Sequence, residues 1–276
     1  MPAARGIRPQ KRWGQHFLVD AAVNRRLIDC IAPASGAAIL EIGPGLGALT
    51  RPLVEAGADV MALELDRTLV ERLRAGAKSP RLIVVEGDAL ARNWTQMTRE
   101  VWGDRPVTVI GNLPYYITGP LVARLWEESA LGWTRAVFMC QAEVGARLAA
   151  IPGSPLAGAP TILLQTVGTV RRLFDVDPTA FDPPPQVTST VIEVARRPVP
   201  AIEPLSALQA VVRAGFGQRR KMLPRALAAL GPAPDWWKAR LRDRGIDPGR
   251  RAERLTLEEW SVVTALWAQD RAGPWE

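Results

Sequence analysis

The sequence predicts an α/β fold, a doubly wound and mostly parallel sheet, followed by a small helical domain. Three observations support it. Short runs rich in Val, Ile and Leu alternate with helical patterns in the first half of the chain. A glycine-rich turn follows the first of these runs, and only helical periodicity is found after residue 204. Runs of this length are typical of strands buried on both faces of a sheet.

The elements follow in order along the chain. The predicted strands are residues 37–42, 59–65, 81–86, 106–111 and 134–140, and the predicted helices are 47–56, 67–75, 93–101, 118–128 and 141–148. After Pro152 the pattern changes, and residues 161–169 and 187–195 are interpreted as two strands around a Pro-rich turn. They predict an antiparallel hairpin that closes the sheet.

Residues 196–204 have the composition of a linker. Beyond it, the helical patterns lie at 206–216, 223–230, 235–244 and 256–268. We therefore predict two domains, residues 1–200 with the sheet and residues 201–276 with helices alone.

Composition narrows the class of protein. The chain has 276 residues, of which 47% are hydrophobic and 23% charged, as in ordinary globular proteins. One histidine and two distant cysteines, Cys30 and Cys140, predict neither a disulfide framework nor a metal site. No apolar run is long enough to span a membrane. We expect a monomeric cytoplasmic protein without metal or membrane partners.

The net charge of +7 is unevenly distributed. Residues 1–26 hold six basic and one acidic side chain, and residues 196–254 hold 14 basic and five acidic ones, whereas residues 27–195 are mildly acidic. The run Arg219, Arg220 and Lys221 precedes a helical pattern. Clustered cations gain affinity for phosphate backbones by releasing counterions, so we expect a polyanion partner bound by these three residues.

Acidic residues and glycines gather at consecutive strand ends. The turn Gly43-Pro44-Gly45-Leu46-Gly47 follows the first strand, Glu64 ends the second and Asp88 ends the third. Glycines allow close approach of a ligand, and carboxylates accept from ribose hydroxyls or an adenine amino group. The pattern indicates a nucleoside site, and it leaves a nicotinamide or flavin enzyme open as an alternative to one that uses S-adenosyl-L-methionine.

Asn112, Leu113, Pro114 and Tyr115 follow the fourth strand and favour a methyltransferase. The Asn112 amide oxygen and a backbone carbonyl near Leu113 are suited to accept the two N–H groups of an exocyclic amine. Both hydrogen bonds would strengthen as positive charge develops on the nitrogen. Pro114 stiffens the loop and Tyr115 offers a ring on which a flipped-out base can stack.

The chain resembles the ribosomal RNA adenine dimethyltransferase family in its small-subunit branch, which is related to the Erm methyltransferases of large-subunit RNA. The resemblance covers nearly the whole length and rests on GQHFL at 14–18, EIGPGLGALT at 41–50, LELD at 63–66, GDAL at 87–90, NLPY at 112–115, QAEVGARL at 141–148, FDPPPQVTS at 181–189, FGQRRK at 216–221 and RAERL at 251–255. NLPY together with the Pro-rich and basic motifs, in this order, is highly specific.

The resemblance implies a class I S-adenosylmethionine-dependent methyltransferase fold, Rossmann-like, with a seven-stranded sheet whose last hairpin is antiparallel. It implies that the cofactor contacts His16, Leu18, Gly43, Glu64, Asp88 and Asn112. Tyr115 and Phe181 would then hold the target adenine between them. His16 stands where the family more commonly has Asn, and Ala142 where it usually has Lys.

The substrate implied by this resemblance is a pair of adjacent adenosines in the 3′-terminal hairpin of 16S ribosomal RNA, each dimethylated, within a precursor of the small ribosomal subunit. Two alternatives stay open beside it: an Erm-like enzyme of large-subunit RNA, and a non-catalytic RNA-binding assembly factor with the same fold.

Overall fold

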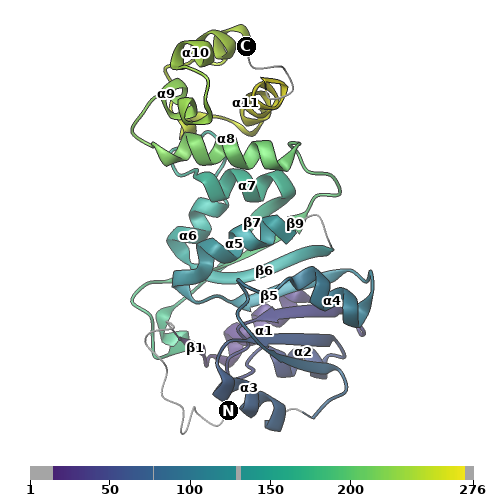
Figure 1. The fold of residues 1–276 in the computed structure, drawn as a ribbon. Coiled ribbons are helices and arrows are strands. Elements are labelled where there is room, and N and C mark those ends of the chain that lie inside the picture. The colour runs from purple at the N-terminus through teal and green to yellow at the C-terminus, as the bar shows by residue number, and fades with distance from the viewer. Residues whose placement is uncertain (1–14, 77, 129–131, 271–276) are drawn as a thin grey trace. The chain divides into compact units, whose positions relative to one another are not determined.

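The computed structural model describes residues 15–76, 78–128 and 132–270, in two compact units (Figure 1). The first unit contains the described residues up to Gly145 together with Arg171–Arg196. The second contains Ala146–Val170 and the described residues from Arg197 onward. The segment Ala146–Val170, which lies before the predicted boundary at residue 200, therefore packs with the helical unit.

A seven-stranded sheet forms the centre of the first unit, with the strand order β4-β3-β2-β5-β6-β9-β7. The strands of this sheet are β2 (Ala38–Ile42), β3 (Asp59–Glu64), β4 (Leu82–Glu86), β5 (Val107–Asn112), β6 (Trp133–Gln141), β7 (Gly168–Val176) and β9 (Ser189–Arg196). The pairs from β4 through β6 are parallel, and β9 runs antiparallel to β6. The predicted sheet and its antiparallel final strand are confirmed.

The strand order reverses between β2 and β5. The chain moves outward from β2 through β3 to β4, then returns to the other side of β2 with β5. In open parallel sheets the loops diverge at such a reversal and leave a crevice at the carboxyl ends of the strands. The predicted site residues that follow β2, β3, β4 and β5 therefore meet at one edge.

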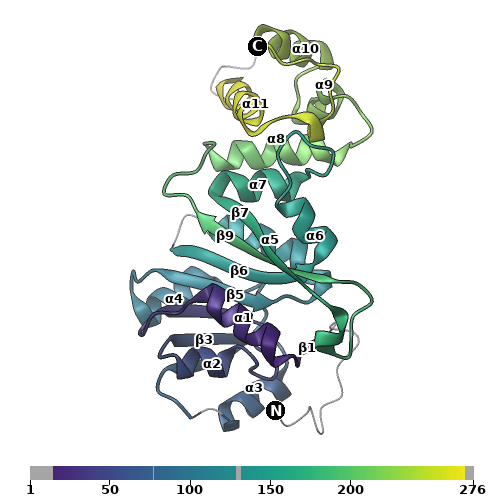
Figure 2. The ribbon, with the colours of Figure 1, turned by 180° about the vertical axis from the view of Figure 1, so that it is seen from behind.

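Helices cover both faces of this sheet. The helices of the first unit are α1 (Ala21–Ile31), α2 (Thr50–Glu55), α3 (Arg67–Gly76), α4 (Trp94–Trp102) and α5 (Thr118–Glu127), with α6 (Ala142–Leu148) at the boundary between the units. Figure 2 shows α1 and α2 in front of the sheet, and Figure 1 shows α4 and α5 in front of its other face. Leu27 of α1 and Leu53 of α2 pack with Ile39, Val60 and Ile110 of the strands in one buried cluster.

A short second sheet joins the N-terminal segment to the Pro-rich region. Strand β1 (Phe17–Leu18) pairs antiparallel with β8 (Phe181–Asp182). The backbone N–H groups of Val19 and Asp20 also donate to the carbonyl of Ala180. These contacts place the segment at residues 15–18 beside the edge where the crevice opens.

The second unit has an all-helical core. Its helices are α7 (Ala159–Val167), α8 (Leu205–Gly217), α9 (Leu223–Leu227), α10 (Pro234–Asp243) and α11 (Leu257–Asp270). Trp237 and Trp260 are fully buried and pack with Leu208, Leu227 and Leu255. The four helical patterns predicted after residue 204 are confirmed.

The predicted strand at residues 161–169 is wrong, because α7 occupies most of that segment. Its run Thr161-Ile162-Leu163-Leu164 is apolar on nearly all sides, so periodicity does not distinguish a buried helix from a buried strand. The Thr161 hydroxyl accepts from the Gly158 N–H at 2.9 Å and donates to the Arg147 carbonyl at 2.7 Å, which fixes the start of the helix. Strand β7 begins only at Gly168.

No helix in the described ranges is both long and apolar enough to cross a membrane.

Gly111 permits the close approach of β5 to β2, which generates a testable prediction. A Cβ at this position would lie 2.6 Å from the Ile42 carbonyl oxygen and 3.0 Å from Leu113. We expect Gly111→Ala to lower the free energy of unfolding by about 1–3 kcal/mol, because the backbone of two paired strands must move apart. Chemical denaturation measures this.

Gly217 at the end of α8 is the control, because it is exposed and a Cβ there would meet no atom within 4 Å. Gly217→Ala should leave the stability unchanged or slightly raised. Equal stability of Gly111→Ala and the wild type would contradict the steric explanation.

Candidate functional site

One pocket of the first unit lies at the carboxyl ends of β2, β3, β4 and β5, and encloses about 1110 Å³ with its open mouth included. Its walls contain the predicted residues His16, Leu18, Gly43, Glu64, Asp88, Asn112, Leu113, Pro114 and Tyr115. Four strand ends and the N-terminal segment thus bring together residues that are almost a hundred positions apart. Phe181 and the basic run at 219–221 are not among the lining residues.

The glycine turn after β2 forms the floor of the pocket. Gly43, Gly45 and Gly47 have φ values of +66°, +57° and +79°, in the left-handed region that favours glycine. The ring of Phe17 lies 3.3 Å from the position a Cβ would take at Gly45. A side chain there would press on this ring and would be strained at this φ value, so the position favours glycine.

Glu64 is held by the backbone around it. It is 7% exposed, and its Oε2 accepts from the Gly45 N–H at 3.1 Å while Oε1 accepts from the Asp66 N–H at 2.9 Å. Burial raises the pKa of Glu64, and the backbone donors act in the opposite direction. A carboxylate offers about four acceptor positions, so two backbone donors leave room for ribose hydroxyls.

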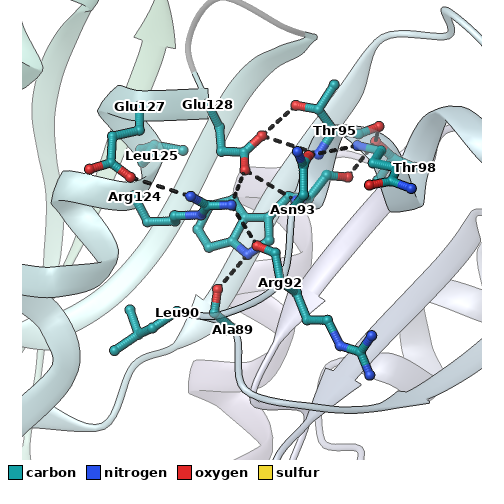
Figure 3. A network of polar contacts seen from close by, with 12 residues as sticks. Ala89, Leu90, Arg92, Asn93, Thr95, Thr98, Arg124, Leu125, Glu127 and Glu128 are labelled. Carbon is teal, nitrogen blue, oxygen red and sulfur yellow. Dashed lines mark hydrogen bonds and ion pairs between the residues drawn. The ribbon is translucent and has the colours of Figure 1, made fainter.

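Asp88 lies at the tip of β4, exposed, with its Oδ1 accepting from the Leu90 N–H at 2.8 Å. A network of polar contacts anchors the loop that carries Asp88 (Figure 3). The Trp94 indole N–H donates to the Ala89 carbonyl at 2.8 Å. Trp94 is itself held, because its backbone N–H donates to the buried carboxylate of Glu128 at 3.2 Å.

Glu128 joins two helices in this network. Its carboxylate accepts from the backbone N–H of Thr95 at 3.2 Å and from the Thr95 hydroxyl, at the first turn of α4. Arg124 pairs with the same carboxylate at 2.6 Å and donates to the Arg92 carbonyl at 2.7 Å (Figure 3). A carboxylate at a helix N-terminus is favoured by the unpaired N–H groups there. The Asp88 loop therefore rests on packed helices.

Asn112 ends β5 and is half-buried in the pocket wall. Its Nδ2 donates to the backbone carbonyl of His16 at 3.1 Å. This hydrogen bond fixes which end of the carboxamide faces the N-terminal segment. Oδ1 then has no partner among the described residues and is available as an acceptor.

Tyr115 begins the short 3-10 turn η2 (Tyr115–Ile117) directly after Pro114. Its ring stacks on that of His16 with 5.6 Å between centroids and 27° between planes. Its hydroxyl forms a 2.7 Å hydrogen bond with the hydroxyl of Ser189. Burial raises the pKa of Tyr115.

His16 links the pocket to the Pro-rich segment. Its Nδ1 donates to the Pro183 carbonyl at 2.7 Å, and its ring stacks on that of Tyr115. Its backbone carbonyl accepts a hydrogen bond from the Asn112 side chain. Two of the three contacts hold residues of the NLPY loop. The histidine therefore acts here as a bridge as well as a part of the pocket wall.

Phe181 lies in β8, paired with Leu18 of β1. Its side chain is 3% exposed and packs with Leu27, Ile31 and Val176 in the core. The stacking role predicted for Phe181 opposite Tyr115 stays a prediction, in which the ring would leave this packing.

Arg219, Arg220 and Lys221 lie in the second unit, in the turn between α8 and α9. All three are exposed, and they form no ion pair within the described part of the chain. The Lys221 N–H donates to the Gln218 carbonyl at 2.8 Å, so the run is a turn that precedes the helix.

The sequence interpretation gave no role to Glu41, Phe17 or Ser189. Glu41 lines the pocket below the glycine turn, Phe17 covers Gly45, and Ser189 holds Tyr115. All three lie within the quoted motifs, but only their tertiary contacts reveal what they do. No group of three or more His, Cys, Asp or Glu side chains within the described ranges is placed to hold a metal ion.

The pocket has the features of a nucleoside site. A glycine backbone, the Glu64 carboxylate and the Asp88 carboxylate lie at successive strand ends of a parallel sheet. In open α/β sheets, nucleotides bind at this edge.

Comparison with known proteins gives a consistent result. The family described as "Ribosomal RNA adenine dimethylase" matches residues 7–269. The chain is 42% identical to the Ribosomal RNA small subunit methyltransferase A of Bordetella petrii, over 96% of this chain and 97% of that protein. It is 41% identical to the protein of the same name from Leptothrix cholodnii, over 93% and 91%.

Two solved structures have the same fold. A dimethyladenosine transferase from Plasmodium falciparum superposes with a TM-score of 0.78, at 21% identity, covering 93% of this chain and 98% of that one. The 23S rRNA methyltransferase ErmE superposes with a TM-score of 0.68, at 24% identity, covering 92% and 100%.

Glu41 generates a prediction on stability and pH. It is 2% exposed, its Oε2 accepts from the Thr50 hydroxyl at 2.7 Å, and burial raises its pKa from 4.5 to about 7, with a contribution from Glu64. The folded state thus keeps this proton after the unfolded state has lost it. As the pH rises from about 4 to about 8, this group therefore lowers the free energy of unfolding of the wild type by about 3 kcal/mol.

Over this pH range, the free energy of unfolding of Glu41→Gln should rise by about 3 kcal/mol relative to that of the wild type. Chemical denaturation at several pH values measures this difference. Glu55→Gln, an exposed change at the end of α2, is the control and should follow the wild type at every pH. A difference between Glu41→Gln and the wild type that does not vary with pH would refute the prediction.

Proposed function

The chain belongs to the ribosomal RNA adenine dimethylase family, and from this premise we propose which RNA it modifies and which residues carry the reaction. It is an rRNA adenine dimethyltransferase that uses S-adenosylmethionine. The substrate we propose is a pair of adjacent adenosines in the 3′-terminal hairpin of 16S ribosomal RNA, within a precursor of the small subunit. We further propose that the enzyme works as a monomer in the cytoplasm.

The observation that carries the assignment of roles is the Asn112 carboxamide, anchored through Nδ2 and open at Oδ1. S-adenosylmethionine supplies an electrophilic methyl group on its sulfonium. The attacking N6 amine is unreactive in the base because its lone pair is delocalised into the ring. An acceptor on an N–H group favours the pyramidal amine and gains strength as the nitrogen becomes positive.

Asn112 is suited to this acceptor role because its carboxamide needs little reorientation when the base binds. The His16 carbonyl already holds its Nδ2, so the Oδ1 acceptor is oriented before the base enters. Leu113 is 1% exposed and its N–H donates to the Met139 carbonyl at 3.0 Å, which fixes the backbone after Asn112 on β6. Once the methyl group has arrived, the nitrogen proton is acidic and leaves to water without a strong base.

Tyr115 is proposed to stack on the extruded adenine, with Pro114 fixing the loop before it. The Pro114 carbonyl accepts from the Ile117 N–H at 3.1 Å and from the Thr118 hydroxyl at 3.3 Å. The ring therefore starts from a short ordered turn, which lowers the entropy cost of capturing the base. Phe181 is proposed as a second ring for the same base.

The cofactor side is proposed to consist of His16, Leu18, Gly43, Glu64, Asp88 and Asn112. Glu64 accepts from ribose hydroxyls, Asp88 accepts from the adenine amino group, and Gly43 lets the chain pass close to the ligand. All six line one pocket, which supports their common role.

The small subunit is the favoured source of RNA because the relatives at about 40% identity carry small-subunit names. The similarity to ErmE supports the fold alone. A purely RNA-binding role is disfavoured, since the glycine turn, both carboxylates and the NLPY loop are assembled around one pocket.

Asn112→Ala tests the proposed function together with the role of the amide. Purified enzyme is incubated with methyl-labelled S-adenosylmethionine and either small-subunit RNA or particles from cells that lack this enzyme. We expect N6,N6-dimethyladenosine at two adjacent positions with the wild type, and at least a hundredfold slower transfer with Asn112→Ala, roughly the effect of removing one oriented transition-state hydrogen bond.

Cofactor affinity of Asn112→Ala, measured by calorimetry, should fall much less than the transfer rate, because the other five residues of the cofactor side remain. Label in large-subunit RNA instead would contradict the proposed substrate. Normal turnover of Asn112→Ala would contradict the role of the carboxamide.

The basic turn at 219–221 provides a second prediction. Arg219→Gln, Arg220→Gln and Lys221→Gln together should weaken RNA binding and reduce the slope of log affinity against log salt by about 2 to 3, because three phosphate contacts no longer release counterions. Binding titrations at several salt concentrations measure this slope.

The control removes the same charge from exposed positions of the first unit, Arg67, Arg72 and Arg99, on α3 and α4. It should leave the slope close to that of the wild type. An equal change in both triple variants would show that net charge, and not the turn, determines RNA binding.

A further inference from the structure

Tyr115 is fixed by the segment that carries the Pro-rich motif, and this contact has no part in the mechanism above. Ser189 begins β9 and is fully buried. Its hydroxyl lies 2.7 Å from the hydroxyl of Tyr115. The hydrogen bond spans 74 positions of sequence and connects the loop after β5 to the far side of β6.

Ser189 has a rigid base. Its backbone pairs with Gln141 in the antiparallel ladder between β9 and β6. The next residue, Thr190, is also fully buried, and its methyl group packs against Gly145 of α6 so closely that a Cβ on this glycine would clash. A hydroxyl on a strand packed in this way holds its position better than one on a loop.

We propose that Ser189 is a positioning residue for the reaction, which holds the ring of Tyr115 at the position where the target adenine stacks on it. The proposal rests on the proposed function, because it concerns the capture of the base. The tyrosine hydroxyl oxygen lies on the axis of the Cβ–Cγ bond, so a contact there restrains rotation about the Cα–Cβ bond. The stacked ring of His16 restrains rotation about the Cβ–Cγ bond. Stacking needs the ring within about 10–20° of the productive plane.

A second contact from the same segment supports this role. Pro183 accepts the Nδ1–H of His16, and the His16 ring stacks on Tyr115. Ser189 therefore holds the tyrosine at its hydroxyl, and Pro183 holds one face of the ring through His16. The other face is left for the base. In this interpretation the FDPPPQVTS segment contributes to catalysis through the tyrosine it fixes.

Loss of the serine hydroxyl has a defined consequence. Tyr115 is half-buried, and burial raises its pKa, so its hydroxyl stays protonated at neutral pH. Without Ser189 the phenol either stays without a partner or turns toward water. Turning tilts the ring and misaligns the base, while Glu64 and Asp88 keep their own backbone hydrogen bonds on the cofactor side.

The test is a double-mutant cycle of Ser189→Ala and Tyr115→Phe with single-turnover methyl transfer to the target RNA. Both changes keep the size of the side chain nearly constant. Each single variant should lower kcat/KM for RNA by roughly three- to tenfold, the effect of one neutral hydrogen bond. The double variant should be no slower than the slower single variant, because both changes remove the same contact.

Two further readouts distinguish positioning from general structure. Cofactor affinity should be unchanged in all variants, and the fluorescence of an RNA with 2-aminopurine at the target position should show weaker base capture. Thr190→Val is the matched control, since it deletes a neighbouring buried hydroxyl that bonds to the Phe174 carbonyl. It should cost stability but leave methyl transfer at the wild-type rate.

Wild-type kcat/KM in Ser189→Ala, or losses that multiply in the double variant, would overturn the positioning role while the function stands. If Ser189→Ala does not fold, Tyr115→Phe alone tests the proposal. Transfer at the wild-type rate by Tyr115→Phe would also overturn the positioning role. Absence of transfer by the wild type would overturn the proposed function and this inference together.

Discussion

The hydrogen bond from Asn112 to the His16 carbonyl is the contact on which the arrangement of the pocket depends. It joins the end of β5 to residues 15–18, the described part of the N-terminal segment, which contains the two-residue strand β1. The same segment places Phe17 over the glycine turn, so one short stretch of chain covers the floor and reaches the wall of the pocket. Because the bond uses Nδ2, it also determines that the acceptor end of the amide is the free one.

Carboxylates held away from water form the other constraint. Glu64 is bound by two backbone N–H groups, whereas the neighbouring Glu41 has a single hydroxyl donor, and burial raises the pKa of Glu41 to about 7. Desolvated carboxylates lower stability, but they recognise hydroxyl and amino groups strongly once a ligand fills the pocket. Behind Asp88, the Glu128 network removes the freedom that an exposed loop would otherwise have.

Much of this arrangement could be predicted from the sequence, for a geometric reason. Parallel strands direct their carboxyl ends to one edge of the sheet. Residues at the ends of successive strands therefore lie close together, as Glu64, Asp88 and Asn112 do. Contacts between distant segments, such as Tyr115 with Ser189, leave no local pattern. Helix α1 could have been found, because Asp20 caps it and apolar residues recur at Val23, Leu27 and Ile31. Helix α7 could not, since its apolar surface removes the periodicity that separates helix from strand.

The most direct test of the account is a crystal structure of the enzyme with S-adenosylhomocysteine and an oligonucleotide that contains the target adenosine. The account predicts the N6 nitrogen at about 2.9 Å from Oδ1 of Asn112, with Nδ2 still on the His16 carbonyl. An adenine bound elsewhere, or an Asn112 amide that has released His16 to present its Nδ2 to the base, would contradict it.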